Sequence, residues 1–104
     1  MEVKVLEGNV NYYKEANNIH VLAFGNIKYG STAKIKLKIE GVLASSLSST
    51  CGCTTAASSE ENVFDISYNE THNISPFSKV FILNYREGSK NLQGQIKITG
   101  NVIR

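Results

Sequence analysis

The sequence contains no tryptophan, one proline and one methionine, and aromatic residues make up only 9% of its 104 residues. No apolar run approaches the ~20 residues of a membrane-spanning helix, so none is expected. The 11 basic and 9 acidic side chains leave a net charge of +2, which gives no electrostatic support for a nucleic-acid partner. The hydrophobic content of 41% is typical of a folded globular chain, and the length predicts one domain spanning residues 1–104.

No secretory signal is recognisable at the amino terminus. A signal peptide needs about 7–15 consecutive apolar residues, whereas charged and apolar residues alternate over Met1–Glu7. We therefore expect a protein that stays in the cytoplasm of the producing cell or is packed into a virion assembled there. In either place the cysteines are expected to be reduced at synthesis.

Apolar and polar residues alternate along most of the chain, and helical periodicity is almost absent. The alternation is clearest at Ala33–Ile39, where three isoleucine and leucine residues are interleaved with lysines. Val80–Leu83 is a continuous apolar run, which predicts a central strand covered on both faces. Turn signals such as Gly25–Asn26 and Glu87–Ser89 separate the strands. The expected strands are residues 3–6, 20–24, 33–39, 41–47, 63–68, 80–83 and 95–102.

About seven short strands in roughly 100 residues predict a two-sheet β-sandwich, with a small barrel as the alternative. The core should be formed by the apolar residues that alternate with polar ones along these strands. The expected core residues are Phe24, Ile35, Leu37, Ile39, Phe64, Ile66, Phe81, Leu83, Ile96, Ile98 and Val102.

Three motifs follow one another along the chain. They are Phe24–Ser31 (FGNIKYGS), Ser49–Thr54 (STCGCT) and the closing Ile96–Val102 (IKITGNV). This order resembles a bacterial family of small immunoglobulin-like domains, common in Bacteroidetes and their phages, with F-G-x-x-x-x-G, C-G-C-T and L-x-I-x-G-x-V motifs. The family is similar to the ASH type of β-sandwich. The resemblance implies an all-β, immunoglobulin-like β-sandwich of about seven strands, and it brings no catalytic residues.

Some residues of these motifs also have a physical interpretation of their own. Phe24 is expected to plug one end of the sandwich, where Gly25 lets the chain turn sharply. Gly30 permits a turn with positive φ before the strand at residues 33–39. Gly100 lies within a predicted strand, which indicates a bulge or a close approach of another part of the chain.

Cys51 and Cys53 are the residues with the most chemistry available to them. Residues two apart on a strand lie about 6.6 Å apart, whereas a disulfide requires Cβ atoms about 3.5–4.5 Å apart, so a bridge needs a kink at Gly52. As metal ligands they need further partners, and His20 and His72 lack a metal-binding spacing. The two cysteines of the C-G-C-T motif, which Thr54 completes, are therefore packing residues, a redox-sensitive pair or metal ligands. No cofactor is expected.

Lys34, Lys36 and Lys38 are expected on one face of a strand. This lysine stripe is suited to phosphates or an acidic partner. The interpretation we favour is a solvated strand face, or lysines that protect a sheet edge from pairing with another chain.

Three tyrosines are further candidates for an interface. Tyr12 and Tyr13 are adjacent in the sequence, and Tyr29 lies near a turn signal. Tyrosines are enriched at protein interfaces because they bury a large area at a low entropy cost. They are also common as ordinary residues at the edge of a sandwich, and the sequence does not favour either interpretation.

No arrangement typical of a catalytic site occurs in the sequence. There is no nucleophile elbow and no glycine-rich phosphate loop, and Asp65 and Glu70 form no recognisable acid–base pair. His20 lies beside an apolar run and is expected to be a partly buried strand residue. We therefore expect no catalytic residues and a non-enzymatic structural or interaction module.

The small fold and the missing signal suggest a phage virion component, such as an auxiliary capsid (decoration) protein. Its partners would be proteins of a multi-copy capsid lattice, bound through strand edges and loops, with no role for nucleic acid or a membrane. One alternative is a cell-envelope or periplasmic immunoglobulin-like domain of a Bacteroidetes-like bacterium. A third is a thiol redox or metal-binding protein.

Overall fold

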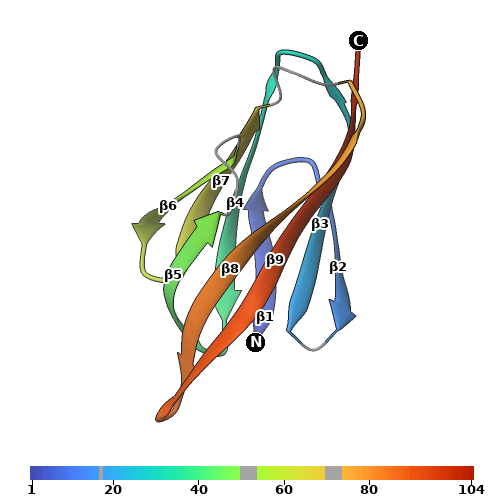
Figure 1. Ribbon diagram of the computed structural model, residues 1–104. Coiled ribbons are helices and arrows are strands. Elements are labelled where there is room, and N and C mark those ends of the chain that lie inside the picture. The colour runs from blue at the N-terminus through green and yellow to red at the C-terminus, as the bar shows by residue number, and fades with distance from the viewer. Residues whose placement is uncertain (17, 50–53, 70–73) are drawn as a thin grey trace.

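The computed structural model describes residues 1–16, 18–49, 54–69 and 74–104, without the side chains of residues 54, 55 and 59. These residues form nine β-strands and no helix, and the strands are arranged in two sheets (Figure 1). None of the described segments is a helix able to cross a membrane. The first sheet has the order β1 (Glu2–Glu7), β4 (Thr32–Glu40), β7 (Val63–Asn69), β6 (Thr54–Glu60). The second has the order β2 (Asn11–Ala16), β3 (Ile19–Lys28), β9 (Lys90–Ile103), β8 (Pro76–Glu87), β5 (Leu43–Ser49).

The strand order is that of an immunoglobulin-like sandwich with two additional strands. In such a domain, strands A to G divide into an ABED sheet and a CFG sheet. Here β1, β4, β7 and β6 take the places of A, B, E and D, while β5, β8 and β9 take those of C, F and G. β2 and β3 extend the second sheet beyond β9, and β3 runs parallel to β9. The predicted immunoglobulin-like sandwich is confirmed, with nine strands in the described residues rather than about seven.

β2 was not expected from the sequence, and β6 was expected only as the second strand of a strand–loop–strand arrangement over Ala44–Ser59. Tyr12 is the one residue of β2 that is not exposed. β6 consists of threonine, alanine, serine and a final glutamate, Glu60. Both strands lie at the edge of a sheet, where backbone pairing on one side holds them. Such strands need little apolar alternation, so the sequence pattern does not show them.

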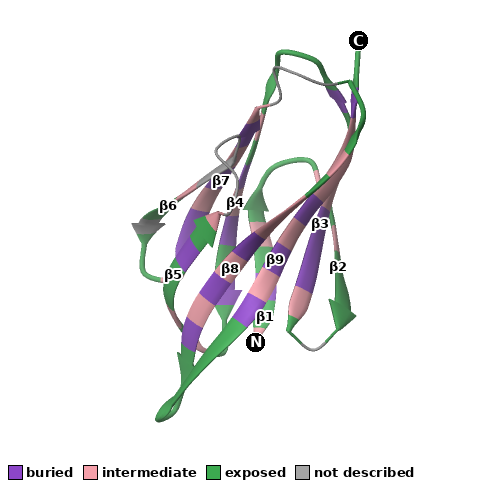
Figure 2. Cartoon of the chain, viewed as in Figure 1, coloured by how far each residue is buried: buried purple, intermediate pink, exposed green. Residues whose placement is uncertain are grey.

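The core lies between the two sheets and is built by the predicted alternation. Figure 2 shows buried and more exposed residues alternating along β8 and β9. Phe24 is only partly buried, although it packs against the core. Tyr68, which alternation with Phe64 and Ile66 predicts to point inward, is buried as well, and so is Tyr85, which was not expected there. The predicted core residues that are buried are Ile35, Leu37, Ile39, Phe64, Ile66, Phe81, Leu83, Ile96, Ile98 and Val102.

β3 does not turn at Gly25, which corrects the expectation of a sharp turn beside Phe24. The strand continues to Lys28, and its register against β9 shifts between Ala23 and Asn26. Gly25 has a φ of 75° and lies in this β-bulge. The physical reason is that glycine supplies a positive φ as readily in a bulge as in a turn. Gly30, with a φ of 85°, does lie in the turn before β4, as predicted.

β8 is central in its sheet, but its two faces differ. The register places β8 between β9 and β5. Phe81 and Leu83 are fully buried in the core, whereas Val80 and Ile82 point to the outer face and are half-buried. No further layer of described residues covers that outer face, so the prediction of a strand covered on both faces is wrong. The four-residue apolar run nevertheless predicted a central strand correctly. Val80 and Ile82 are partly buried because they pack against side chains of the neighbouring strands.

Gly100 confirms the predicted close approach. It is the register partner of Phe77 in β8, and a Cβ atom at position 100 would lie 2.7 Å from the Phe77 ring and 2.8 Å from the Gly25 carbonyl oxygen. The Phe77 ring stacks on Tyr68 of the opposite sheet, with 4.1 Å between ring centroids. The missing side chain of Gly100 therefore makes room for an aromatic contact that joins the two sheets.

Asn62 holds the turn between β6 and β7 against the connection between β4 and β5. It has a φ of 63°, which is uncommon outside glycine. Its Oδ1 accepts a hydrogen bond from the backbone N–H of Ala44 at 2.8 Å. Its Nδ2 donates to the carbonyl oxygens of Ile39 at 3.0 Å and Val42 at 2.7 Å. One side chain thus fixes backbone groups of both sheets.

Candidate functional site

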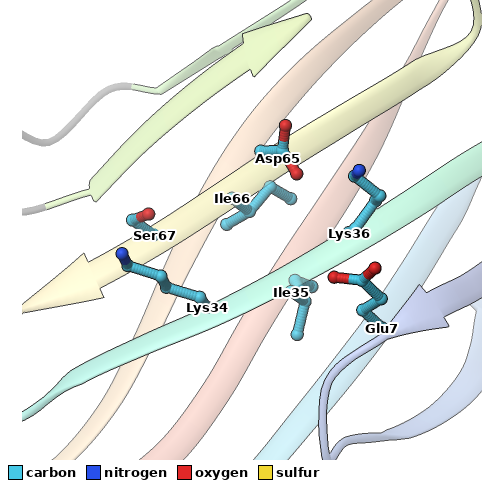
Figure 3. Close-up of a pocket in the computed structure, with 7 residues that line it drawn as sticks. All are labelled: Glu7, Lys34, Ile35, Lys36, Asp65, Ile66 and Ser67. Carbon is cyan, nitrogen blue, oxygen red and sulfur yellow. The ribbon is translucent and has the colours of Figure 1, made fainter. Parts of the chain in front are cut away.

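A shallow hollow on the outer face of the first sheet gathers charged and polar side chains. It has a volume of about 310 Å³ and lies over β4 and β7, and the end of β1 contributes to its rim (Figure 3). The backbone of Ile35 and Ile66 lies beneath it, since both side chains point away from the hollow into the core. The polar side chains around it are Glu7, Lys34, Lys36, Asp65 and Ser67.

The alternation in β4 and β7 explains why these polar side chains face the hollow. The isoleucine and leucine residues of β4 point into the core, so Lys34, Lys36 and Lys38 point outward. Pairing with β7 then places Ser67 beside Lys34 and Asp65 beside Lys36. The polar side chains therefore face the hollow because their apolar neighbours along each strand are buried in the core.

A β-bulge brings Glu7 to the same face. Val5 pairs with Leu37, but the next paired residue of β1 is Glu7, which lies opposite Lys36. Without the extra residue, Leu6 would take the place opposite Lys36 and the Glu7 side chain would point toward the core. The bulge therefore places a carboxylate on each side of Lys36.

The charged groups of the hollow are not paired with one another. In the described part of the chain, the ion pairs within 4.0 Å join Lys14 to Glu2 and Lys97 to Glu15, at 3.8 and 3.3 Å. Lys36 is half-buried between its two acidic neighbours, without an ion pair to either. The hollow thus presents free ammonium donors and free carboxylate acceptors to solvent.

The lysine stripe extends beyond the hollow. Residues two apart on a strand are separated by about 6.8 Å, so the three lysines of β4 span about 14 Å. Lys4 of β1 is the register partner of Lys38 and adds a fourth cation on this face. β4 lies between β1 and β7, so the interpretation of these lysines as protection of a sheet edge is wrong. The position of β4 inside the sheet depends on strand pairing, which the sequence does not show.

The three tyrosines do not form one surface. The Tyr12 hydroxyl is 2.6 Å from Nδ1 of His20, and the two rings are stacked. Tyr13 points to the opposite face of β2 and is 51% exposed. Tyr29, 44% exposed, follows the far end of β3. A single interface built from all three side chains is therefore not formed within one copy of the chain.

His20 is more deeply buried than expected. It is fully enclosed, and its Nε2 atom has no hydrogen-bond partner among the residues that the structure describes. Burial lowers the pKa of His20 below its usual value, and the nearby Lys14 ammonium lowers this pKa further. The expectation of a partly buried residue is corrected because β2, a strand not expected from the sequence, covers the ring.

The cysteine motif cannot be placed in the site. Cys51, Gly52 and Cys53 lie outside the described residues, and Thr54 begins β6. His72 also lies outside them. Among the residues that are described, no group of three or more histidine, cysteine, aspartate or glutamate side chains is arranged to hold a metal ion.

The outer face of the second sheet differs from the lysine-bearing face because it carries few charges. A hydrogen-bonded ladder crosses it from Gln93 to Asn84 and from Asn84 to Ser46, at 2.9 and 3.0 Å. The ion pair between Lys97 and Glu15 spans β3 on this face, with its two charges neutralising each other. The charged groups available for a ligand are therefore concentrated on the first sheet.

Glu7 and Ser67 are the residues of the hollow that the sequence did not single out. Both reach the lysines only through strand pairing, Ser67 from β7 and Glu7 through the bulge in β1. The alternation of Phe64, Ile66 and Tyr68 did place Ser67 on an outer face. It gave no indication of which strand lay beside it.

No family model matches the chain, and no curated protein matches it. The fold is similar to that of solved structures of the endo-fucoidan hydrolase MfFcnA4 from glycoside hydrolase family 107. One of these, a single-residue variant, has a TM-score of 0.58 at 15% identity, and the other has 0.56 at 13%. The similarity covers 89% of this chain, which spans 15% of the length of the hydrolase chain. Likeness at this level of identity shows the fold alone.

These structures contradict the expected function. A non-enzymatic module in a phage virion, with an envelope domain or a thiol protein as alternatives, had been inferred from the size of the fold and the missing signal. The proteins of similar fold are instead polysaccharide hydrolases by name. The inference failed because a small immunoglobulin-like sandwich can be a part of many unrelated proteins, so its outline does not determine its role.

Proposed function

We propose that the chain is an accessory domain that binds an acidic polysaccharide along β4. The observation that carries this proposal is the hollow of Figure 3, where unpaired ammonium and carboxylate groups lie side by side on an open sheet face. Lys34, Lys36 and Lys38 lie in line along the strand and would contact the acidic groups of an extended chain. The proposed role is binding rather than cleavage, in keeping with a hollow that is open to water.

The carboxylates beside Lys36 suit a polyhydroxylated ligand. Each ionised carboxylate accepts hydrogen bonds, and sugar hydroxyl groups donate them. Glu7 and Asp65 flank the middle of the lysine stripe, so a sugar chain on β4 would meet donors along its length and acceptors on both sides.

The similarity in fold supports a role beside a catalytic domain. A segment of this fold accounts for 15% of a hydrolase whose name assigns it a polysaccharide substrate. A domain that holds the same polymer would raise its effective concentration near a catalytic centre without taking part in the chemistry. The contacts proposed for the lysine stripe are individually weak, which allows the polymer to slide and be released.

Removing two lysines of the stripe should weaken polysaccharide binding. We expect the Lys34→Ala, Lys36→Ala double variant to bind a sulfated fucan about threefold to tenfold more weakly, because each exposed charge contact contributes up to about 1 kcal/mol. Affinity electrophoresis in gels that contain the sulfated fucan measures the change, and added salt should reduce binding by the wild-type chain.

The matched control removes two positive charges from the β8–β9 hairpin, at Arg86 and Lys90, where both side chains are exposed. The Arg86→Ala, Lys90→Ala variant should keep most of the affinity. Equal losses in the two double variants would contradict the proposal, since net charge alone would then explain binding. A wild-type chain that is not retarded by the polysaccharide would contradict it as well.

A further inference from the structure

β2 closes one edge of the second sheet with few buried contacts of its own. Among the described strands it pairs only with β3, and Tyr12 is its one residue that is not exposed. The register against β3 shifts between Lys14 and Ala16, so regular pairing is limited to residues 11–14. Few buried contacts and exposed backbone pairing are typical of a segment that opens before the rest of a domain unfolds.

The Tyr12–His20 pair is the main buried contact of this strand. The Tyr12 hydroxyl lies 2.6 Å from His20 Nδ1, and the rings stack with 5.8 Å between centroids and 11° between planes. His20 is fully buried, and Nε2 has no partner in the part of the chain that the structure describes. A neutral His20 ring carries one N–H group and tolerates this position. A charged ring carries two N–H groups that both need acceptors, and only one partner, the Tyr12 hydroxyl, is present among the described residues.

The charged and titratable groups around His20 come from several elements. Lys14 of β2 is its cross-strand partner, and Lys14 together with the amino terminus of Met1 opposes a positive charge on the ring. Glu2 of β1 favours that charge, but its carboxylate is in an ion pair with Lys14 at 3.8 Å.

The remaining neighbours contribute no charge to this pocket. On the β9 side, the register partner of His20 is the apolar Ile96, and Lys97 points to the outer face, where it is paired with Glu15. From β8, the Tyr85 hydroxyl donates to Asn18 Oδ1 at 3.3 Å. Burial and two nearby cations therefore outweigh one carboxylate that already has a partner.

We propose that Tyr12 and His20 form a proton-operated latch, in which protonation of His20 releases β2 from the edge of β3. Release removes the Tyr12 ring from His20 and lets water solvate both N–H groups of the His20 ring. It also uncovers the β3 backbone groups that β2 had paired. A free strand edge of this kind accepts an extended segment as an additional strand, so acidification would open a pairing site.

The direction of the pH dependence follows from linkage. The pKa of His20 is lowered in the closed state, so the open state binds more protons below the ordinary histidine value of 6.5. Closure is therefore fully favourable above that pH and is lost progressively as the pH falls. Between pH 7 and pH 5 the open population should rise by at most about 25-fold, the value for a closed state that takes up no proton.

Hydrogen exchange at pH 7 and pH 5, corrected for the intrinsic exchange rates, tests the latch. We expect protection of the amides of residues 11–14 to fall at pH 5, by up to the limit of about 25-fold, while the amides of β8 and β9 remain protected. The His20→Gln variant, with a neutral side chain, should lose the pH dependence. The His72→Gln variant removes the other histidine and should retain it.

Two hydrogen-exchange results would overturn the proposal. One is loss of protection in β2, β8 and β9 together at pH 5, which would indicate global destabilisation. The other is a fall in β2 protection that persists in the His20→Gln variant. Because that variant could be poorly folded, the imidazole NMR signals of the wild-type chain provide a second test. A His20 ring that titrates while the β2 amides stay protected would also contradict the latch.

Discussion

The Asn62→Ala variant should lower the free energy of unfolding by about 3–4 kcal/mol. Three hydrogen bonds are lost, each with a net contribution of about 0.5–1.5 kcal/mol, and partly buried backbone groups of Ile39, Val42 and Ala44 lose their partner. Alanine is also strained at the φ of 63° that Asn62 adopts, by about 1 kcal/mol. Urea denaturation followed by circular dichroism measures the change.

The Asn62→Gly variant separates these two causes. Glycine adopts a positive φ without strain, so this variant loses the hydrogen bonds alone and should be about 1 kcal/mol more stable than Asn62→Ala. A loss of less than about 1 kcal/mol in Asn62→Ala would show that the clamp between the β6–β7 turn and β5 contributes little.

The Gly100→Ala variant should lower the free energy of unfolding by about 2–3 kcal/mol. The new methyl group would lie 2.7 Å from the Phe77 ring and 2.8 Å from the Gly25 carbonyl oxygen, both well inside van der Waals contact. Forcing an extra methyl group into a packed region costs about 1–3 kcal/mol. Relief requires displacement of Phe77 from Tyr68, on which it stacks, so the loss should lie at the upper end of this range. Thermal and urea unfolding both measure it.

A double-mutant cycle with Phe77→Ala identifies the cause of that loss. When the Phe77 ring is absent, Gly100→Ala should cost at least about 1 kcal/mol less than in the wild-type chain, because one of its two clashes is gone. Strictly additive losses would contradict the proposed contact. The Gly25 carbonyl oxygen explains a remaining cost in the double variant.

The alternation of side chains predicted part of the core correctly. Ile35, Leu37 and Ile39 are buried as expected because a strand with one buried face must repeat every two residues. The alternation does not report edge strands such as β2, which is held by backbone pairing. It also does not distinguish a bulge from a turn at Gly25, since both need the same positive φ.

The sequence predicted only part of the candidate site. The lysines of β4 were singled out because they alternate with core residues, but their neighbours depend on strand pairing. Glu7 lies beside Lys36 because of a one-residue bulge in β1, and no local pattern indicates which strand β1 pairs with. His20 was expected to be partly buried, and its full enclosure depends on β2, which the sequence did not reveal. The neighbours of the lysines and the burial of His20 thus depend on strand pairing, which the sequence pattern does not report.

Binding on the lysine-bearing face is tested most directly by an NMR titration of the ¹⁵N-labelled chain with a short sulfated fuco-oligosaccharide. Amide shifts should change in β4 (Thr32–Glu40) and β7 (Val63–Asn69), near the hollow, and much less in β8 and β9. Changes confined to the second sheet would contradict binding along β4, and so would a titration that leaves every amide shift unchanged.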